Sequence, residues 1–215
     1  MISSMPQDIS IVIHGAAGQG LNTLESVLAD IVQHAGFYVF SSSEYMSRIR
    51  GGDNSVEIRL TTFPVLAFVK RIDLLISMSP LGVEHLSHRI TKNTIIIADD
   101  AIIETKYSNS GKKLFANSIV MGFVLSLLNI FSTLYLPVIK KYFSNDTLRE
   151  NIQSIDYGYQ LADKLCDQKQ LTKYSITATP LTNFNITTGT EAIAAGALVV
   201  EIFKFYAPSS WRSMS

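Results

Sequence analysis

The chain has 215 residues, of which 47% are hydrophobic and 17% charged, and its 18 basic and 18 acidic residues give a formal net charge of zero. This length suits one well-filled domain with an appendage, and the composition excludes a disordered chain. The charge balance argues against a general nucleic-acid binder, because such a protein needs a cationic face to displace counterions.

A strand, a glycine-rich turn, a helix and a second strand are predicted first along the chain. The β-branched run Ile9–His14 is typical of a buried strand and leads into Gly15. Apolar residues recur at helical spacing over 21–34, and Ala35-Gly36 is a common helix end. The run Phe37–Phe40 predicts the second strand. Together these elements form one βαβ unit, the building block of parallel, helix-covered sheets.

Two segments of different character follow. Ser41–Ile49 is polar and is expected at the edge of the sheet. From Asn54 to Thr62 apolar and polar residues alternate, which predicts a strand with one solvent-exposed face that carries Glu57 and Arg59.

Two further buried strands are predicted over 73–78 and 94–98, with a helix that begins at Pro80 between them. The order of these elements predicts an α/β fold: a Rossmann-like open, mostly parallel sheet covered by helices, followed by a C-terminal linker and an extra helix.

The apolar segment 118–139 has two interpretations. Its length suggests a membrane span, but it carries polar residues near its middle and then Pro137. Two helices buried in a protein core, broken between Ile130 and Leu136, agree better with these residues. An amphipathic helix is predicted next, over 152–166.

Residues 168–187 lose the pattern of the preceding elements and are interpreted as a linker. A new alanine-rich helical stretch then begins at Thr188. We therefore expect a domain over 1–167, a linker over 168–187 and the beginning of a different element over 188–215.

Metal-binding and redox chemistry have little support in the sequence. Cys166 is the single cysteine, so it cannot form an intramolecular disulfide or hold an iron–sulfur cluster alone. His85 and His88 could share one helix face, but no third ligand joins them in a recognisable pattern, and a solvated face is the simpler interpretation. The lone cysteine and the absence of a secretory signal over 1–10 favour a cytoplasmic protein.

The turn between the first strand and the first helix is the main candidate binding site. Glycines let the backbone turn sharply, and the free N–H groups of the helix start attract an anion such as a phosphate. The same turn also serves a tight strand-to-helix connection without any ligand. Ala17 replaces the middle glycine of the dinucleotide fingerprint, so specific NAD binding is weakly supported. The candidate residues are Gly15, Gly18, Gln19 and Gly20.

A second candidate is the arginine-glycine-glycine stretch Arg50, Gly51 and Gly52. The arginine could hold a phosphate or a carboxylate with two hydrogen bonds. Alternatively, the glycines supply only the bend before the alternating strand, and the arginine pairs with a nearby carboxylate. No arrangement of residues typical of a catalytic nucleophile is present, so no catalytic residue is assigned.

Read in order, these motifs resemble the gamma subunit or domain of the 2-oxoacid:ferredoxin oxidoreductases. The shared features are the turn 15–20, Arg50-Gly51-Gly52 with the strand that ends at Arg59, Asn117 with Gly122, and Asn151 with Gly158-Tyr159. The stretch 189–197 also resembles the opening helix of the family's alpha portion. The chain is thus similar to fused gamma–alpha members, with the alpha portion only beginning here.

The resemblance implies a role in oxidative decarboxylation of a 2-oxoacid to an acyl-CoA within an assembled complex. It implies that thiamine diphosphate and the iron–sulfur clusters belong to partner alpha and beta domains or subunits, with ferredoxin as an indirect partner. It also implies that this domain contributes to assembly and to coenzyme A binding, with Gln19 as a side-chain donor and Arg50 as a cation for the anion.

One departure from the family's pattern leaves other functions open. The family's threonine before a Pro-Ser-Ser motif has no counterpart beside Pro208. A stand-alone Rossmann-like protein that binds NAD or flavin, and a structural remnant that binds nothing, are therefore the alternatives. The sequence does not identify the oxoacid.

Overall fold

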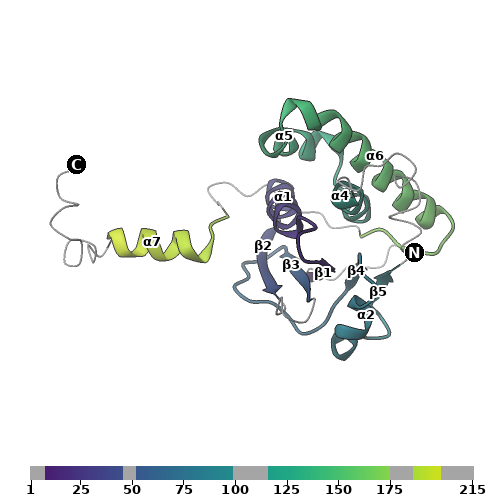
Figure 1. The fold of residues 1–215 in the computed structure, drawn as a ribbon, viewed down its shortest axis with the longest axis horizontal. Helices are drawn as coiled ribbons and strands as arrows, with labels where there is room; N and C mark the ends of the chain where they lie inside the picture. The colour runs from purple at the N-terminus through teal and green to yellow at the C-terminus, as the bar shows by residue number, and fades with distance from the viewer. Residues whose placement is uncertain (1–7, 46–51, 99–115, 175–185, 200–215) are drawn as a thin grey trace. The chain divides into compact units, whose positions relative to one another are not determined.

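The computed structural model describes residues 8–45, 52–98, 116–174 and 186–199. The chain divides into two compact units, residues 1–182 and residues 183–215, and the boundary falls inside the expected linker 168–187. In the first unit, a layer of helices covers one face of a sheet and a short helix covers the other (Figure 1).

The sheet is open and has five strands in the order β2-β3-β1-β4-β5. The strands are β1 (Asp8–Ala16), β2 (Tyr38–Tyr45), β3 (Asp53–Thr61), β4 (Leu74–Ser77) and β5 (Ile95–Ile97). The helix α1 (Leu21–His34) follows β1 and carries a buried stripe at helical spacing, as predicted. The expected open α/β fold is therefore confirmed, and the polar run 41–45 lies on the edge strand β2, as expected.

The sheet is mixed, with four strands running in one direction and β3 antiparallel to them, which agrees with the expectation of a mostly parallel sheet. β1 pairs with β4, and β4 with β5, in parallel, but β3 is antiparallel to both β1 and β2. The predicted β1-α1-β2 unit is present with its two strands running in the same direction. The chain then reverses and inserts β3 between them, so β1 and β2 are not neighbours. Strand periodicity reports which face a side chain occupies, but it carries no information about strand order.

The two faces of the sheet differ in polarity. On one face, the odd-numbered residues of β1 and the even-numbered residues of β3 join α1 and three later helices in the main apolar core. The opposite face carries Ser10, His14, Glu57 and Ser77, together with a small apolar cluster around Val12. The expected solvent-exposed face of β3 is therefore buried: Glu57 is only 7% exposed.

The covering layer on this polar face is the segment that follows β4. It contains the short helix α2 (Gly82–His85) and the 3-10 helix η2 (Ser87–Arg89). Leu86 packs against Val12, and the Arg89 side chain donates to Glu57 at 2.7 Å. The alternating sequence pattern correctly separated the two faces, but a later segment decided that the polar face is covered.

The remaining helices of the first unit are α4 (Ala116–Leu127), α5 (Ser132–Tyr142) and α6 (Asn145–Asp167). The break between α4 and α5 lies earlier than predicted, because Asn129 adopts a left-handed conformation (φ 55°) that ends α4. Pro137 lies inside α5, where its ring removes one helix hydrogen bond without ending the helix. Among the described residues, no helix is both long and apolar enough to cross a bilayer.

Polar contacts fix α4 against α6. Ser118 donates to Asn151 Oδ1 at 2.6 Å, and the Asn151 amide donates to the Thr147 carbonyl at 2.8 Å. Beyond α6 the chain folds back, because Tyr174 N–H donates to the Leu127 carbonyl and the Asn129 amide donates to the Tyr174 carbonyl. These bonds pair the half-buried Asn129 amide and the carbonyl end of α4 at the same time.

The second unit contains the helix α7 (Gly189–Val199). Thr188 and Glu191 cap its first turn: the Thr188 backbone N–H donates to Glu191 Oε2 at 2.7 Å, and Glu191 N–H donates to Thr188 Oγ1 at 3.2 Å. This reciprocal pair is a capping box. The helical stretch predicted to begin at Thr188 is thus observed over Gly189–Val199, and the residues that follow lie outside the described ranges.

Candidate functional site

The glycine turn, residues 15–20, connects the carboxyl end of β1 to the amino terminus of α1. Gly18 (φ 90°) and Gly20 (φ 76°) both adopt the left-handed conformation that favours glycine. Gln19 N–H closes the turn by donating to the Ala16 carbonyl at 3.2 Å. Gly18 and Gly20 are therefore required by the backbone conformation itself.

The side chain of Gln19 folds back into the turn. Its Oε1 atom accepts a hydrogen bond from Ala16 N–H at 2.9 Å. Gly15 lies directly beneath this side chain, and a Cβ atom there would also meet Met78 Cε at 3.1 Å. Gln19 thus stabilises the turn through its oxygen, and its Nε2 group is the side-chain atom with donor capacity for a ligand.

Two helix amino termini meet at this turn. Gly20 is the N-cap of α1, and the helix has neither a side-chain cap nor an acidic residue in its first turn. Asn117, in the first turn of α4, donates its Nδ2 group to the Gln19 carbonyl. The backbone N–H groups at the start of α1 therefore lack the usual side-chain acceptors, and no acidic side chain in the first turn of either helix opposes an anion.

The start of β3 lies beside the glycine turn. Strand pairing places Asp53 opposite Ala16 and Asn54 opposite Gly15. Gly52, which precedes Asp53, is half-buried. The two candidate motifs from the sequence are thus brought to the same edge of the sheet, although Arg50 and Gly51 themselves lie outside the described residues.

Beyond the start of β3, the end of β2 contacts α1. Ser43 donates to Glu25 Oε2 at 2.5 Å, and the Tyr45 hydroxyl donates to Asn22 Oδ1 at 3.1 Å. The Tyr45 side chain is 62% exposed. An exposed aromatic ring therefore stands next to the amino terminus of α1.

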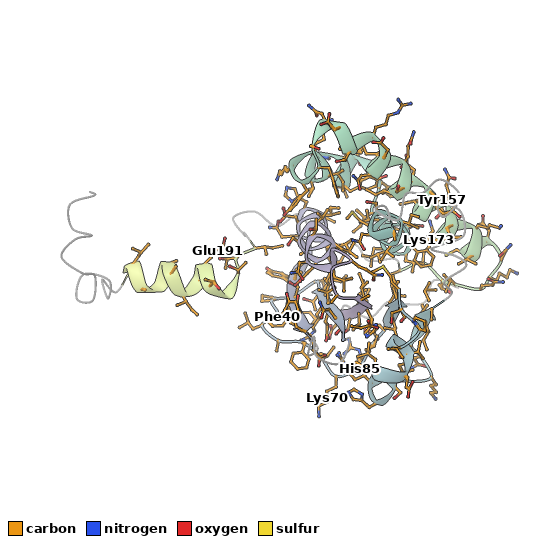
Figure 2. The ribbon with its side chains drawn as sticks, in the orientation of Figure 1. Phe40, Lys70, His85, Tyr157, Lys173 and Glu191 are labelled. Atoms are coloured by element: carbon orange, nitrogen blue, oxygen red, sulfur yellow. The ribbon has the colours of Figure 1, made fainter. Side chains whose placement is uncertain are left out.

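A buried polar cluster lies under the turn on the α2 side of the sheet. His14, the last residue before the turn, is 1% exposed, and its Nδ1 atom is 3.7 Å from Asp53 Oδ2. Its ring also lies 5.9 Å from the ring of His85 on α2, which Figure 2 shows on the side of the sheet opposite to α1, α4 and α6. Burial lowers the pKa of His14 below its usual value, and the nearby Asp53 partly opposes this effect.

Two serines complete this cluster. The Ser79 hydroxyl donates to Asp53 Oδ2, and the Ser77 hydroxyl donates to the Ser79 carbonyl at 2.6 Å. The carboxylate of Asp53 is therefore bound by a neutral donor and lies beside a neutral imidazole. Sequence analysis missed this cluster; the only signals were a histidine at the end of an apolar strand and a glycine soon after Pro80.

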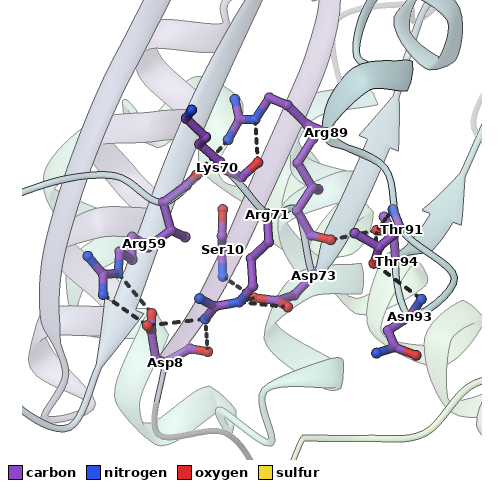
Figure 3. Close-up of polar contacts among 12 residues, drawn as sticks. Asp8, Ser10, Arg59, Lys70, Arg71, Asp73, Arg89, Thr91, Asn93 and Thr94 are labelled. Atoms are coloured by element: carbon purple, nitrogen blue, oxygen red, sulfur yellow. Dashed lines mark hydrogen bonds and ion pairs between the residues drawn. The ribbon is translucent and has the colours of Figure 1, made fainter.

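A charged network occupies the opposite end of the sheet, at the start of β1 (Figure 3). Arg59 donates to both carboxylate oxygens of Asp8, at 2.8 and 2.9 Å. Arg71 contacts Asp8 at 3.1 Å and Asp73 at 3.2 Å, and Asp73 accepts from Ser10 N–H at 2.8 Å. Because every charge in this network is paired, we assign it a structural role.

Metal binding has no support among the described residues, which contain no group of three or more histidine, cysteine or acidic side chains suited to a metal ion. His88 is exposed on η2, whereas His85 is half-buried next to His14, so these two histidines do not act as a pair. Cys166 is half-buried in α6, and burial raises the pKa of its thiol.

Comparison with known proteins identifies relatives for most of the chain. Residues 10–161 match the family model described as pyruvate ferredoxin/flavodoxin oxidoreductase. The KorC subunit of 2-oxoglutarate synthase from Archaeoglobus fulgidus is 24% identical in an alignment of 180 residues that covers 77% of this chain and 94% of that subunit. The 2-oxoacid:ferredoxin oxidoreductase alpha subunit from a Sulfolobus species is 31% identical over 98 residues. That match spans 46% of this chain and only 15% of the alpha subunit.

One solved structure with the same fold is the 2-oxoglutarate:ferredoxin oxidoreductase from Magnetococcus marinus, which contains 2-oxoglutarate, coenzyme A and succinyl-CoA. The TM-score is 0.75 at 16% identity, and the similarity covers 90% of this chain and 37% of the other. At this identity the likeness concerns the fold alone.

Proposed function

The chain belongs to the pyruvate ferredoxin/flavodoxin oxidoreductase family, and from this premise we propose that it is the gamma-type domain of a 2-oxoacid:ferredoxin oxidoreductase complex. That complex would oxidatively decarboxylate a 2-oxoacid to an acyl-CoA. The extent of the match to KorC, which covers nearly the whole of that subunit, supports the gamma assignment. The chain by itself carries no catalytic residue in this proposal.

The glycine turn would bind a phosphate group of coenzyme A. The observation that carries this proposal is the α1 amino terminus, whose N–H groups lie behind a left-handed glycine turn without a side-chain cap or an acidic residue. Such a terminus attracts anions through its free donors and its dipole. The coenzyme A in the Magnetococcus marinus enzyme is consistent with a ligand of this class.

Each predicted residue has a part in this binding. Gly15, Gly18 and Gly20 shape the turn, and Gln19 would donate from Nε2 while its Oε1 atom holds Ala16 N–H. Gly52 borders the turn because of the β1–β3 register. Arg50 and Gly51, which directly precede Gly52 in the sequence, would add a cation and a close backbone approach.

Thiamine diphosphate and the iron–sulfur clusters would belong to the alpha and beta domains or subunits of the complex, with ferredoxin as the electron acceptor. The donor set of this chain agrees with that division, because one cysteine cannot ligate a cluster. We further propose that residues 1–167 form the gamma-type domain, that 168–187 form a linker, and that 188–215 belong to an alpha-type portion. The complex would be cytoplasmic, because a lone cysteine suits a reducing compartment.

The test is the affinity of the complex for coenzyme A, measured by isothermal titration calorimetry with the Gln19→Glu variant. Glutamate keeps an oxygen acceptor for Ala16 N–H, but it removes the Nε2 donor and adds a negative charge at the turn. We expect coenzyme A affinity to fall about tenfold or more, because a charge-assisted contact contributes about 1.5–3 kcal/mol. Gln160→Glu, which adds the same charge at an exposed position of α6, is the matched control and should bind normally.

Arg50→Ala tests the second motif in the same assay. Unchanged affinity of this variant would remove Arg50 from the site while leaving the glycine turn in place. Unchanged affinity of Gln19→Glu would remove the turn from coenzyme A binding altogether. Binding of NAD or flavin by the chain would instead favour a stand-alone nucleotide-binding function.

A further inference from the structure

His14 is a buried histidine whose ring has no hydrogen-bond partner among the described residues. Both Nδ1 and Nε2 are enclosed and unpaired, and the residue is 1% exposed. An imidazole always offers one donor and one acceptor when neutral, and leaving both unpaired in a protein interior is unfavourable. A buried polar side chain that keeps this arrangement calls for an explanation beyond packing.

The surroundings of His14 hold the ring against a carboxylate. Gly82 of α2 leaves room for the ring, because a Cβ atom there would lie 2.7 Å from His14 Nδ1. The nearest carboxylate oxygen, Asp53 Oδ2, is 3.7 Å from the same nitrogen. This separation is too long for a hydrogen bond and short enough for an ion pair once the ring is protonated. Meanwhile the Ser79 hydroxyl occupies the same carboxylate oxygen.

His14 and Asp53 both lie next to the glycine turn that is proposed to bind the anion. His14 is followed directly by Gly15, where the glycine turn begins. Asp53 begins β3 and pairs with Ala16 inside that turn. A shift of either side chain therefore acts on backbone that leads directly into the turn.

We propose that His14 and Asp53 are positioning residues of the glycine turn, and that protonation of His14 draws the pair together and strengthens anion binding there. This inference rests on the proposed function, because it assigns a proton-linked control to the same site. A protonated ring cancels the buried negative charge of Asp53 next to the turn. A bound anion, in return, stabilises the protonated ring, because the coupling between two binding events is reciprocal.

The charged groups around His14 are consistent with a ring that gains a proton when an anion binds. The titratable groups that act on it among the described residues are Asp53 of β3, His85 of α2 and Glu44 of β2; β4 presents the neutral Ser77. The two carboxylates favour protonation, whereas burial and His85 oppose it, with burial the largest effect. The ring is therefore neutral at neutral pH, and an added anion shifts the balance towards the charged form.

The first experiment measures coenzyme A affinity of the complex at pH 8 and at pH 5.5 for the wild type and for His14→Gln. The phosphates of coenzyme A titrate in this range too, but equally in both proteins, so the difference between the two proteins reports His14. We expect the wild type to gain at least about fivefold more affinity on acidification than the variant. Asp53→Asn should also lack this extra increase in coenzyme A affinity on acidification, because the variant no longer offers a carboxylate to the protonated ring.

His88→Gln is the matched control. It replaces an exposed histidine of η2 that is not among the groups acting on His14, and its affinity should keep the wild-type pH dependence. Equal pH dependence in the wild type and His14→Gln would overturn the proposal.

A ligand-free measurement separates this inference from the proposed function. In an NMR titration of the full chain, the backbone amides of Gly15 and Gly18 should shift with the same midpoint as the His14 ring and stop doing so in Asp53→Asn. Failure of the wild type to bind coenzyme A at either pH would refute the proposed function, while this titration would still decide whether His14 positions the turn. If the chemical shifts of these amides do not follow the His14 titration, the positioning role is refuted.

Discussion

Gly122 of α4 and Gly158 of α6 form a reciprocal contact in which each glycine packs on the backbone of the other helix. A Cβ atom at Gly122 would lie 2.7 Å from the carbonyl carbon of Ile155, and one at Gly158 would lie 2.8 Å from the carbonyl carbon of Ile119. The backbones of the two helices are therefore in direct contact. Any side chain larger than hydrogen at these two positions would prevent this contact. Both glycines were matched to the family from the sequence, and the packing explains why small residues are needed there.

Replacement of Gly158 by alanine should destabilise the first unit by about 1–3 kcal/mol, because the added methyl forces α4 and α6 apart in a well-packed core. Urea denaturation followed by circular dichroism measures this change. Gly196→Ala is the control: it adds the same methyl to α7, where no atom lies within 4 Å. A Gly158→Ala protein as stable as the wild type would show that the helices separate without cost.

Replacement of Gly20 by alanine should cost more stability than replacement of Gly18. Both residues have positive φ, so alanine is strained by about 1–2 kcal/mol at either position. At Gly20 the new methyl also lies 2.9 Å from Asn117 Nδ2, whereas the space around Gly18 is open. Thermal unfolding of both variants gives the difference, and adding Asn117→Ala to Gly20→Ala should recover it. Equal costs for the two single variants would remove Asn117 as the source of the clash.

Removal of the Arg89 side chain should be strongly destabilising. Glu57 is buried and accepts hydrogen bonds from Arg89 at 2.7 Å and from Ser10 at 3.0 Å. Arg89→Met leaves this carboxylate without a countercharge, at a cost of about 3–5 kcal/mol. Adding Glu57→Gln removes the buried charge and should restore a large part of the lost free energy of unfolding in a double-mutant cycle. No recovery in the double variant would argue that Arg89 acts through packing.

The ion pair at the start of β1 should make stability sensitive to acid. Hydrogen bonds from Arg59, the largest influence, and charges from Arg71 lower the pKa of Asp8 below its ordinary value of 3.8, although burial opposes them. Its stabilising contribution is therefore complete above pH 3.8 and disappears as the pH falls through the lowered pKa. Asp8→Asn should lose about 1.5–3 kcal/mol at pH 7 and show a weaker loss of stability between pH 5 and pH 2. An acid profile identical to that of the wild type would contradict this assignment.

Neutral burial of His14 should reduce stability in mild acid. Because the pKa of His14 in the folded protein is below its ordinary value of 6.5, the unfolded chain binds a proton first as the pH falls. Stability should therefore decrease below about pH 6.5, with a slope of at most about 1.4 kcal/mol per pH unit from this group, and level off below the folded pKa. His14→Gln should flatten this part of the profile in chemical denaturation between pH 7 and pH 5. A His14→Gln profile as steep as that of the wild type would assign the loss to another group.

Much of the fold was predictable because local patterns report local structure. The β-branched run before Gly15, the helical repeat over 21–34 and the alternation over 54–62 each identified an element that the structure contains. The glycine turn was equally accessible, since Gly18 and Gly20 adopt backbone conformations that glycine favours. The short-range pattern of apolar residues and turn formers is a property of the sequence alone.

Tertiary structure decided the relations between elements. The alternation in β3 separated its two faces, but only the fold of α2 and η2 over the sheet made Glu57 a buried residue paired with Arg89. Likewise, the insertion of β3 between β1 and β2 brought Asp53 within 3.7 Å of His14. Strand order and face coverage depend on which distant segments pack together, and the free energy of that packing is shared over many side chains. The sequence determines strand order and face coverage, but no local pattern in the sequence reveals them.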